Sequence, residues 1–274
     1  MPDCPYPVHL CQPDARKSCG ACCGLYNYQD HSRAYLRDLL EKRTALYASF
    51  GDRFQREEYQ EKEAVLETSP KLLEAICNCE FLGFLDSGKK KVGCLLHPSQ
   101  NQGEELRYHS YYGPALCANH FCPSYSHLTV AEQKAVVSVL DDWYLYGLVI
   151  TDIDLVKEFF RHAQDRMGDC LDPKRLAREP VQDALRAFFA LKENWDFAAR
   201  TNRLGKYYFS FSEYQIARID YEKRWKIKPS RFDKILLSLS SEFSSLEEVQ
   251  GAEAVIEEKI RAFVGAYQES GSTG

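Results

Sequence analysis

Cys19–Gly24 has the sequence CGACCG, and the rest of the chain is organised around this segment. Three thiols fall within five residues, and the neighbouring glycines allow the backbone to bend around whatever the sulfur atoms hold. Adjacent cysteines pack no better than alanine or valine, whereas a Cys-x-x-Cys spacing lets two thiolates of one turn bind a single metal ion. We therefore predict that Cys19, Cys22 and Cys23 are metal ligands.

More cysteines follow, and ten of the 11 lie before residue 123. Cys117 and Cys122 form a second chelating pair, whose spacing suits zinc or an iron–sulfur cluster. Cys77 and Cys79 would point to opposite faces of a strand, and we favour Cys79 as the ligand because it directly precedes a predicted hairpin. The predicted metal ligands are Cys19, Cys22, Cys23, Cys79, Cys94, Cys117 and Cys122.

These seven thiols, with Cys77 as an eighth candidate, exceed the four that one zinc ion or one cubane cluster takes. Either two metal centres form, or some of the cysteines are spectators or redox partners. All-thiolate ligation suits both zinc and iron, and the excess of cysteines around one hairpin favours an iron–sulfur cluster of the 4Fe-4S type over zinc. Cys4, Cys11 and Cys170 are expected to be small core residues.

Three histidines lie near the predicted ligands. His120 stands between Cys117 and Cys122, where an imidazole could bind metal or transfer protons. We favour an ordinary hydrogen-bonded loop histidine, and we interpret His97 and His109 in the same way. The sequence shows no Ser/His/Asp signature, phosphate-binding glycine loop or HExxH motif, so it identifies no catalytic residue.

Composition is that of an ordinary globular protein, with 45% hydrophobic and 27% charged residues in a chain of 274. The formal net charge of −5 is spread evenly, so neither half has the excess of basic residues that a nucleic-acid-binding surface needs. The basic, aromatic segment Arg218–Lys228 is expected to be a helix with a solvated charged face. Nucleic acid is therefore not an expected partner.

The beginning of the chain lacks the basic and apolar regions of a signal peptide. The longest apolar run, near Trp143–Ile150, is too short to span a bilayer. We therefore expect a cytoplasmic protein with no membrane partner. In a reducing compartment, 11 cysteines are expected to include metal ligands rather than to form a disulfide framework.

The predicted fold class is mostly α (α+β), with two lobes. A cysteine-rich metal-binding lobe over residues 1–128 contains a small β-hairpin and packs on a helical bundle over residues 129–268. A tail at 269–274 is expected to be disordered. Two apolar runs at 80–85 and 92–96, separated by a turn, predict the hairpin. Residues 98–114 are expected to form a surface loop.

Hydrophobic spacing and capping signals predict the helices. The segment 32–67 is expected to form one or two amphipathic helices, and Pro70 to begin a short helix that ends near Ile76. Thr129 and Glu132 form a capping box for a helix to about Gly147. Further helices are expected from Asp152 or Asp154 to Met167, from Pro173 or Pro180 through Leu191, and from Ser245 to Tyr267, with a strand at Tyr207–Phe211.

The order of the cysteine motifs resembles that of the YkgJ, or CxxCxxCC, family of zinc- or iron-chelating proteins. The resemblance covers residues 16–123 and implies an iron–sulfur or zinc site. For some members it also implies a redox or protein-modifying role, such as lysine methylation of flagellin. The matching motifs are Cys-Gly-x-Cys-Cys at Cys19–Cys23, Cys-x-Phe-Leu at Cys79–Leu82, Gly-Cys with a following proline at Gly93–Pro98, and Pro-x-x-Cys-x4-Cys at Pro114–Cys122.

The chain departs from the family pattern in several places. Arg16 stands where the family has its first cysteine, so Cys11 or Cys4 must substitute or one ligand is missing. Gly113 precedes Pro114 where the family has arginine, Ala118 replaces a second arginine, and Ser99–Tyr112 is an insertion. These differences argue against a catalytic role in common with the family more strongly than they argue against metal chelation in common with it.

Two functions follow from these observations. The first is a protein that binds an iron–sulfur cluster or zinc and has a redox, maturation or protein-modifying role, in which the helical half shields the metal and forms a surface for a protein partner or substrate. The alternative is a non-catalytic interaction module, in which zinc only stabilises the fold.

Overall fold

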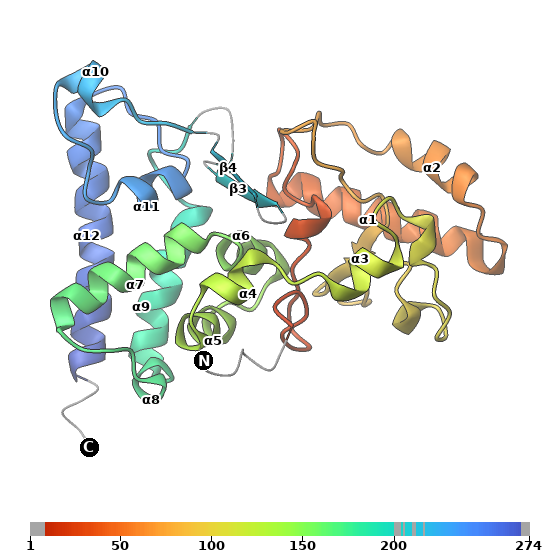
Figure 1. Ribbon diagram of the computed structural model, residues 1–274, viewed down its shortest axis with the longest axis horizontal. Helices are drawn as coiled ribbons and strands as arrows, with labels where there is room; N and C mark the ends of the chain where they lie inside the picture. Colours follow the sequence, from red (N-terminus) through yellow and green to blue (C-terminus); the bar gives the residue numbers. More distant parts are fainter. Residues whose placement is uncertain (1–8, 200–203, 205, 210–211, 216, 270–274) are drawn as a thin grey trace. The chain divides into compact units, whose positions relative to one another are not determined.

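The computed structural model describes residues 9–199, 204, 206–209, 212–215 and 217–269 (Figure 1). Over these residues the chain is mostly helical, and its strands form two antiparallel hairpins. The expected fold class, mostly α with a small hairpin, is therefore confirmed. Cys4, the tail residues 270–274 and residues 210–211 of the expected strand lie outside the described residues.

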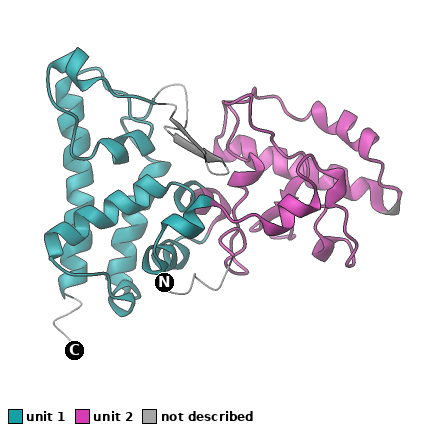
Figure 2. Cartoon of the chain, in the orientation of Figure 1, with its two compact units in different colours: residues 1–7, 123–141, 148–274 teal, residues 8–122, 142–147 magenta. Residues whose placement is uncertain are grey.

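The chain divides into two compact units (Figure 2). The cysteine unit contains Val8–Cys122 and a short return segment, Asp142–Gly147. The helical unit contains Pro123–Asp141 and Leu148–Gly274. The lobes expected from the sequence, divided between residues 128 and 129, did not include the return segment.

Two helices and the 3-10 turn between them form the charged part of the cysteine unit. They are α1 (Arg33–Phe50), η2 (Gly51–Arg53) and α2 (Arg56–Ala64). The Ser32 hydroxyl begins α1 by accepting a hydrogen bond from the Tyr35 amide. The leucines at helical spacing in α1 include three that are buried, as expected for an amphipathic helix.

The prediction of a short helix after Pro70 is wrong, because the backbone groups of this segment form hydrogen bonds with another segment. The Pro70 carbonyl accepts a hydrogen bond from the Gln29 amide at 2.8 Å, and the Leu73 amide donates to Asn27 Oδ1 at 2.9 Å. The Asn27 amide group also donates to the carbonyls of Leu73 and Ile76. Groups paired in this way cannot bond along a helix, so the segment is a loop.

The predicted hairpin is confirmed. β1 (Leu82–Phe84) pairs with β2 (Val92–Cys94), and Leu82 lies opposite Cys94. The Asp86 carboxylate fixes the turn by accepting hydrogen bonds from the amides of Lys90 and Lys91. This pairing places Cys94 beside the strand that follows Cys79.

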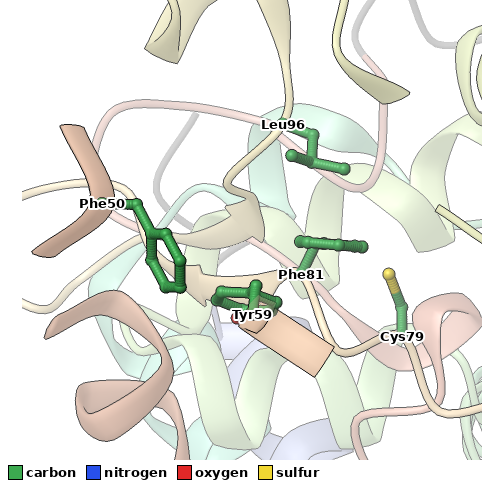
Figure 3. Close-up of a cluster of buried hydrophobic side chains, with 5 residues drawn as sticks. All are labelled: Phe50, Tyr59, Cys79, Phe81 and Leu96. Atoms are coloured by element: carbon green, nitrogen blue, oxygen red, sulfur yellow. The ribbon is translucent and has the colours of Figure 1, made fainter. Parts of the chain in front are cut away.

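A buried cluster of side chains lies next to the hairpin (Figure 3). The Tyr59 and Phe81 rings stack at 4.9 Å between centroids, and the Tyr59 hydroxyl donates to the Glu80 carbonyl. Phe50 and Leu96 complete the cluster with Cys79, a predicted metal ligand. The cluster therefore holds the Cys79 backbone in place.

The expected surface loop after the hairpin contains three short helical turns. They are η3 (Pro98–Gln100), η4 (Arg107–His109) and the beginning of α3 (Gly113–Asn119). Cys117 is carried by α3, and Cys122 follows it.

The return segment is the first part of α6 (Trp143–Ile150). Its backbone and tyrosines are bound to segments near the beginning of the chain. The Tyr26 hydroxyl donates to the Tyr144 carbonyl at 2.9 Å, and the Tyr146 hydroxyl donates to the Leu10 carbonyl at 2.8 Å. These hydrogen bonds explain why the segment belongs to the cysteine unit.

The helical unit begins with α4 (Pro123–His127) and α5 (Val130–Val139). The predicted capping box of Thr129 and Glu132 is confirmed, with both of its hydrogen bonds formed. The prediction of one helix from Thr129 to about Gly147 is wrong, since α5 ends at Val139 and α6 begins a few residues later. The reason is Asp142, whose carboxylate accepts hydrogen bonds from two amides of the first turn of α6.

The core of the helical unit lies between α7 (Ile153–Met167), α9 (Glu179–Phe189) and α12 (Leu246–Glu269). The Phe159 ring lies 4.2 Å from that of Phe188 and 5.1 Å from that of Phe263. The remaining elements are α8 (Pro173–Leu176), η5 (Ala190–Lys192), β3 (Lys206–Phe209), β4 (Ser212–Gln215), α10 (Tyr221–Trp225) and α11 (Asp233–Ser238).

Candidate metal centre

The CGACCG segment forms a 3-10 turn, η1 (Ala21–Cys23), and Gly24 ends it. Gly24 has a φ of 85°, in the left-handed region that side chains rarely adopt. A Cβ atom added there would also lie 2.7 Å from the Asn78 Cα atom and 2.8 Å from the Cys77 carbonyl oxygen. Glycine is therefore required here, both for the turn and for the close approach of the Cys77–Asn78 backbone.

Replacing Gly24 with alanine is expected to lower the free energy of unfolding of the cysteine unit by about 2–5 kcal/mol, because left-handed strain and steric overlap add. Gly103 is the matched control: its φ is 95°, but nothing lies within 4 Å of an added Cβ. Gly103→Ala should therefore cost only the strain, about 1–2 kcal/mol. Denaturant unfolding of both variants measures the difference, and equal losses would contradict the close approach.

Two backbone hydrogen bonds bring other cysteines to the turn. The Cys19 amide donates to the Cys11 carbonyl at 2.9 Å, and the Cys79 amide donates to the Cys23 carbonyl at 2.8 Å. The segment just before the turn and the distant segment around Cys79 are thus each hydrogen-bonded to one end of the CGACCG turn.

A first thiol group consists of Cys11, Cys19, Cys22 and Cys122. The thiols of Cys22 and Cys122 are hydrogen-bonded. This hydrogen bond and burial together raise the pKa of Cys22 well above its ordinary value. Burial raises the pKa of Cys19 to about 12, with a smaller contribution from Cys122. Burial, followed by the neighbouring Cys19 and Cys122, also raises the pKa of Cys11 well above its ordinary value.

A second thiol group consists of Cys23, Cys79, Cys94 and Cys117, and it adjoins the first group because Cys23 also has Cys11 and Cys19 as neighbours. Burial raises the pKa of Cys79 well above its ordinary value, and the neighbouring Cys23 and Cys94 raise it further. Burial also raises the pKa of Cys94 to about 11, and Cys117 adds to the shift. The Cys117 thiol, the exposed member of the group, lies 3.9 Å from the Ser110 hydroxyl.

Burial and the neighbouring thiols oppose the thiolate form and so raise the pKa of Cys11, Cys19, Cys22, Cys23, Cys79 and Cys94. The ten described cysteines are all free, so no disulfide competes for the sulfur atoms of that set. Over the same part of the chain, no group of three or more Cys, His, Asp or Glu side chains is already arranged to hold a metal ion. The donor set is chemically suited to zinc or iron, but binding would require the sulfur atoms to converge.

The cysteine unit contains all seven predicted ligands, and the thiol of Cys11, a residue that was expected to lie in the core, adjoins Cys19 and Cys122. The sequence signal for Cys11 was the missing family cysteine at Arg16. Cys77 has no cysteine among its main electrostatic neighbours, and its carbonyl accepts a hydrogen bond from Tyr112 at 2.7 Å. Cys170 is exposed, so its expected place in the core is wrong.

His120 differs from the loop histidine that was expected. Its Nε2 atom is buried and has no hydrogen-bond partner within the described parts of the chain. Burial, with a smaller effect of His9, lowers the pKa of His120 and keeps the imidazole neutral at neutral pH. His97 does fit the expectation, since its Nδ1 accepts a hydrogen bond from the Ser99 amide, and the His109 ring packs against Phe54.

Large apolar side chains are exposed near the second thiol group. Tyr108 and Tyr111 precede Cys117, Leu116 is its direct neighbour, and Phe121 follows it. Each of these four side chains is about half exposed or more. The segment that carries Cys117 is therefore both accessible and apolar.

No helix within the described ranges is both long enough and apolar enough to cross a membrane. Comparison with known proteins adds no further assignment. No family model, no curated protein and no solved structure matches this chain.

Proposed function

We propose that this chain is a metal-binding protein whose cysteine unit holds an iron–sulfur cluster or zinc through clustered thiolates. The observation that carries the proposal is that thiols distant in the sequence, such as Cys11 and Cys122, lie near one another around η1. The ligands that we predicted from the sequence, together with Cys11, are free. Cys19, Cys79 and Cys122 are buried, Cys117 is exposed, and the others are partly buried. Buried, mutually repelling thiols are costly as thiolates unless a cation neutralises them, and a metal ion or cluster does so.

The iron–sulfur assignment is the one that we favour, because eight thiols are more than one zinc ion takes. The motif order that resembles the YkgJ family supports the same class of centre. A redox or protein-modifying role would use the accessible segment around Cys117 as the approach for a protein partner or substrate. A cytoplasmic location suits this chemistry, because reduced thiols persist there.

The alternative is a non-catalytic module stabilised by zinc, and one observation favours it. The segments 9–32 and 65–81 carry six of the predicted ligands or candidates but contain only η1 and an isolated bridge, Tyr28 with Lys71, as regular structure. Chain of this kind gains most from a metal cross-link.

The test is anaerobic purification followed by elemental analysis and a visible absorption spectrum. Brown protein with iron and acid-labile sulfide, bleached by dithionite, is the expected result. Colourless protein that holds zinc would support the module instead. Protein with neither metal, after purification without chelators, would contradict both.

Replacing Cys22 and Cys23 together with serine is expected to remove all of the metal, because this pair serves both thiol groups. Cys170→Ser is the matched control, since Cys170 is exposed and belongs to the helical unit. It should leave the metal content unchanged. Full metal content in the Cys22→Ser, Cys23→Ser variant would contradict the ligand assignment.

A further inference from the structure

The basic, aromatic segment Arg218–Lys228 forms a much shorter helix than the sequence predicted (Figure 1). The helix, α10, contains only Tyr221–Trp225 and ends at Lys226, whose φ of 58° lies in the left-handed region. A left-handed residue stops a helix, so Ile227 and Lys228 follow without regular structure. The charged side chains therefore lie on one short turn and on the loop after it, rather than along a helix face.

Four cations of this segment are exposed and have no ion pair within the part of the chain that the structure describes. They form what we call the basic loop: Lys223, Arg224, Lys226 and Lys228. The cations on either side differ, because Arg218 lies 3.8 Å from a carboxylate oxygen of Asp220 and Arg231 is paired with Glu257. From residue 221 to residue 229 these four cations stand against one carboxylate. The basic loop thus carries an excess of positive charge that its own surroundings do not neutralise.

Arg224 of the basic loop is positioned by an aromatic ring. Its guanidinium lies 4.8 Å from the centre of the half-buried Trp225 ring, and the buried Tyr221 ring lies 6.3 Å from the same indole. Stacking restricts the arginine without using its N–H donors. A planar guanidinium that is held in this way is suited to bind both oxygens of a carboxylate.

The same contact decides between two classes of anionic partner. Proteins bind single-stranded nucleic acid by stacking bases on aromatic rings, whereas Arg224 already lies over the Trp225 ring. The net charge of −5 over the whole chain also repels a long polyanion, which would extend beyond the basic loop. A short acidic segment of a protein would contact the basic loop alone, where cations prevail.

We propose that the basic loop is a docking site for an acidic segment of a partner protein, whose Asp or Glu side chains pair with the four cations. Arg224 contributes most, because its stacked guanidinium can bind one carboxylate through two N–H groups. The inference goes beyond the proposed function, since the basic loop belongs to the helical unit and docking there requires no metal.

The test is fluorescence anisotropy of a labelled peptide of alternating glutamate and glycine, titrated with the full-length chain. Binding is expected at low salt and should weaken as salt is added, because exposed charges are screened. Arg224→Ala should weaken binding about tenfold, which corresponds to the loss of a hydrogen-bonded charge pair. Arg224→Lys should weaken it nearly as much, because lysine keeps the charge but lacks the planar fork.

Arg261→Ala is the matched control. Arg261 is exposed, belongs to the same unit and likewise has no ion pair within the described ranges. Its replacement removes one positive charge and should leave peptide binding unchanged. Trp225→Leu should weaken binding although Arg224 remains, because the ring that positions the guanidinium is lost. Far-UV circular dichroism reports whether each variant remains folded.

Each possible outcome either supports the docking site or overturns it. Absence of peptide binding by the unmodified chain, or undiminished binding by Arg224→Ala, would overturn it. Equal losses in Arg224→Ala and Arg261→Ala would show attraction by overall charge rather than by the basic loop. Tighter binding of a labelled thymidine oligonucleotide than of the peptide would assign the basic loop to nucleic acid instead. The metal content, which elemental analysis measures, tests the proposed function separately.

Discussion

Removal of the metal that we propose for the cysteine unit is expected to unfold this unit while the helical unit keeps its helices. Structural zinc contributes about 10–16 kcal/mol of binding free energy in small thiolate domains, which is comparable to the whole stability of an ordinary domain. Without metal, the ligand-bearing segments 9–32 and 65–81 keep little regular structure to hold them. The helical unit has its own aromatic core around Phe159 and does not contain the predicted ligands.

Amide hydrogen exchange before and after chelation measures this effect. Peptides from 9–32 and 65–81 should lose their protection, and peptides from α7 and α9 should keep theirs. The Cys22→Ser, Cys23→Ser variant is the control, because a chain without metal should not respond to the chelator. Unchanged protection of the cysteine unit after complete metal removal would show that its fold does not depend on metal.

Replacing Arg43 with alanine is expected to lower the free energy of unfolding by about 3–5 kcal/mol, because it leaves a buried carboxylate without its cation. Arg43 is 1% exposed, and its Nε lies 2.7 Å from a carboxylate oxygen of Glu63, which is 5% exposed. The same guanidinium donates to Glu67 and to the Tyr28 hydroxyl. Lys42→Ala is the matched control on α1, since the exposed pair of Lys42 with Asp38 is worth about 0.3–0.5 kcal/mol.

The loss should depend on pH. Burial raises the pKa of Glu63 above its ordinary value, and Arg43 opposes that shift. A raised pKa in the folded state means that the contribution of this carboxyl to stability is present at low pH and is lost as the pH rises through the folded-state pKa. Without Arg43 the pKa rises further, so the Arg43→Ala variant should lose more stability at pH 7 than at pH 4.

Denaturant unfolding at the two pH values measures this difference. In a second variant, Glu63→Gln added to Arg43→Ala should recover part of the loss at pH 7, because it removes the unpaired charge. The same loss at both pH values would show that packing, rather than the charge of Glu63, accounts for the effect.

Several elements could be predicted from the sequence because their determinants are local. The β1–β2 hairpin depends on two apolar runs and a turn closed by Asp86. The capping box of Thr129 and Glu132 lies within a single turn of α5. The amphipathic spacing of α1 and α12 likewise lies within each helix.

Other features could not be predicted, because they depend on partners far away in the sequence. Pro70 has the signals of a helix start, but Asn27 and Gln29 bind the backbone of its segment instead. Nothing in the α6 sequence indicates that its beginning belongs with Leu10 and Tyr26, since two long-range hydrogen bonds decide it.

The cysteine site shows the same division. The sequence by itself determined which thiols are candidates, because the Cys-x-x-Cys spacing and the hairpin are local patterns. Only the tertiary structure placed Cys11 beside both Cys22 and Cys23, brought Cys94 and Cys117 near Cys23, and left Cys77 apart. The physical reason is that thiols from separate segments are brought together by backbone hydrogen bonds and burial over the whole unit, which no single stretch of sequence contains.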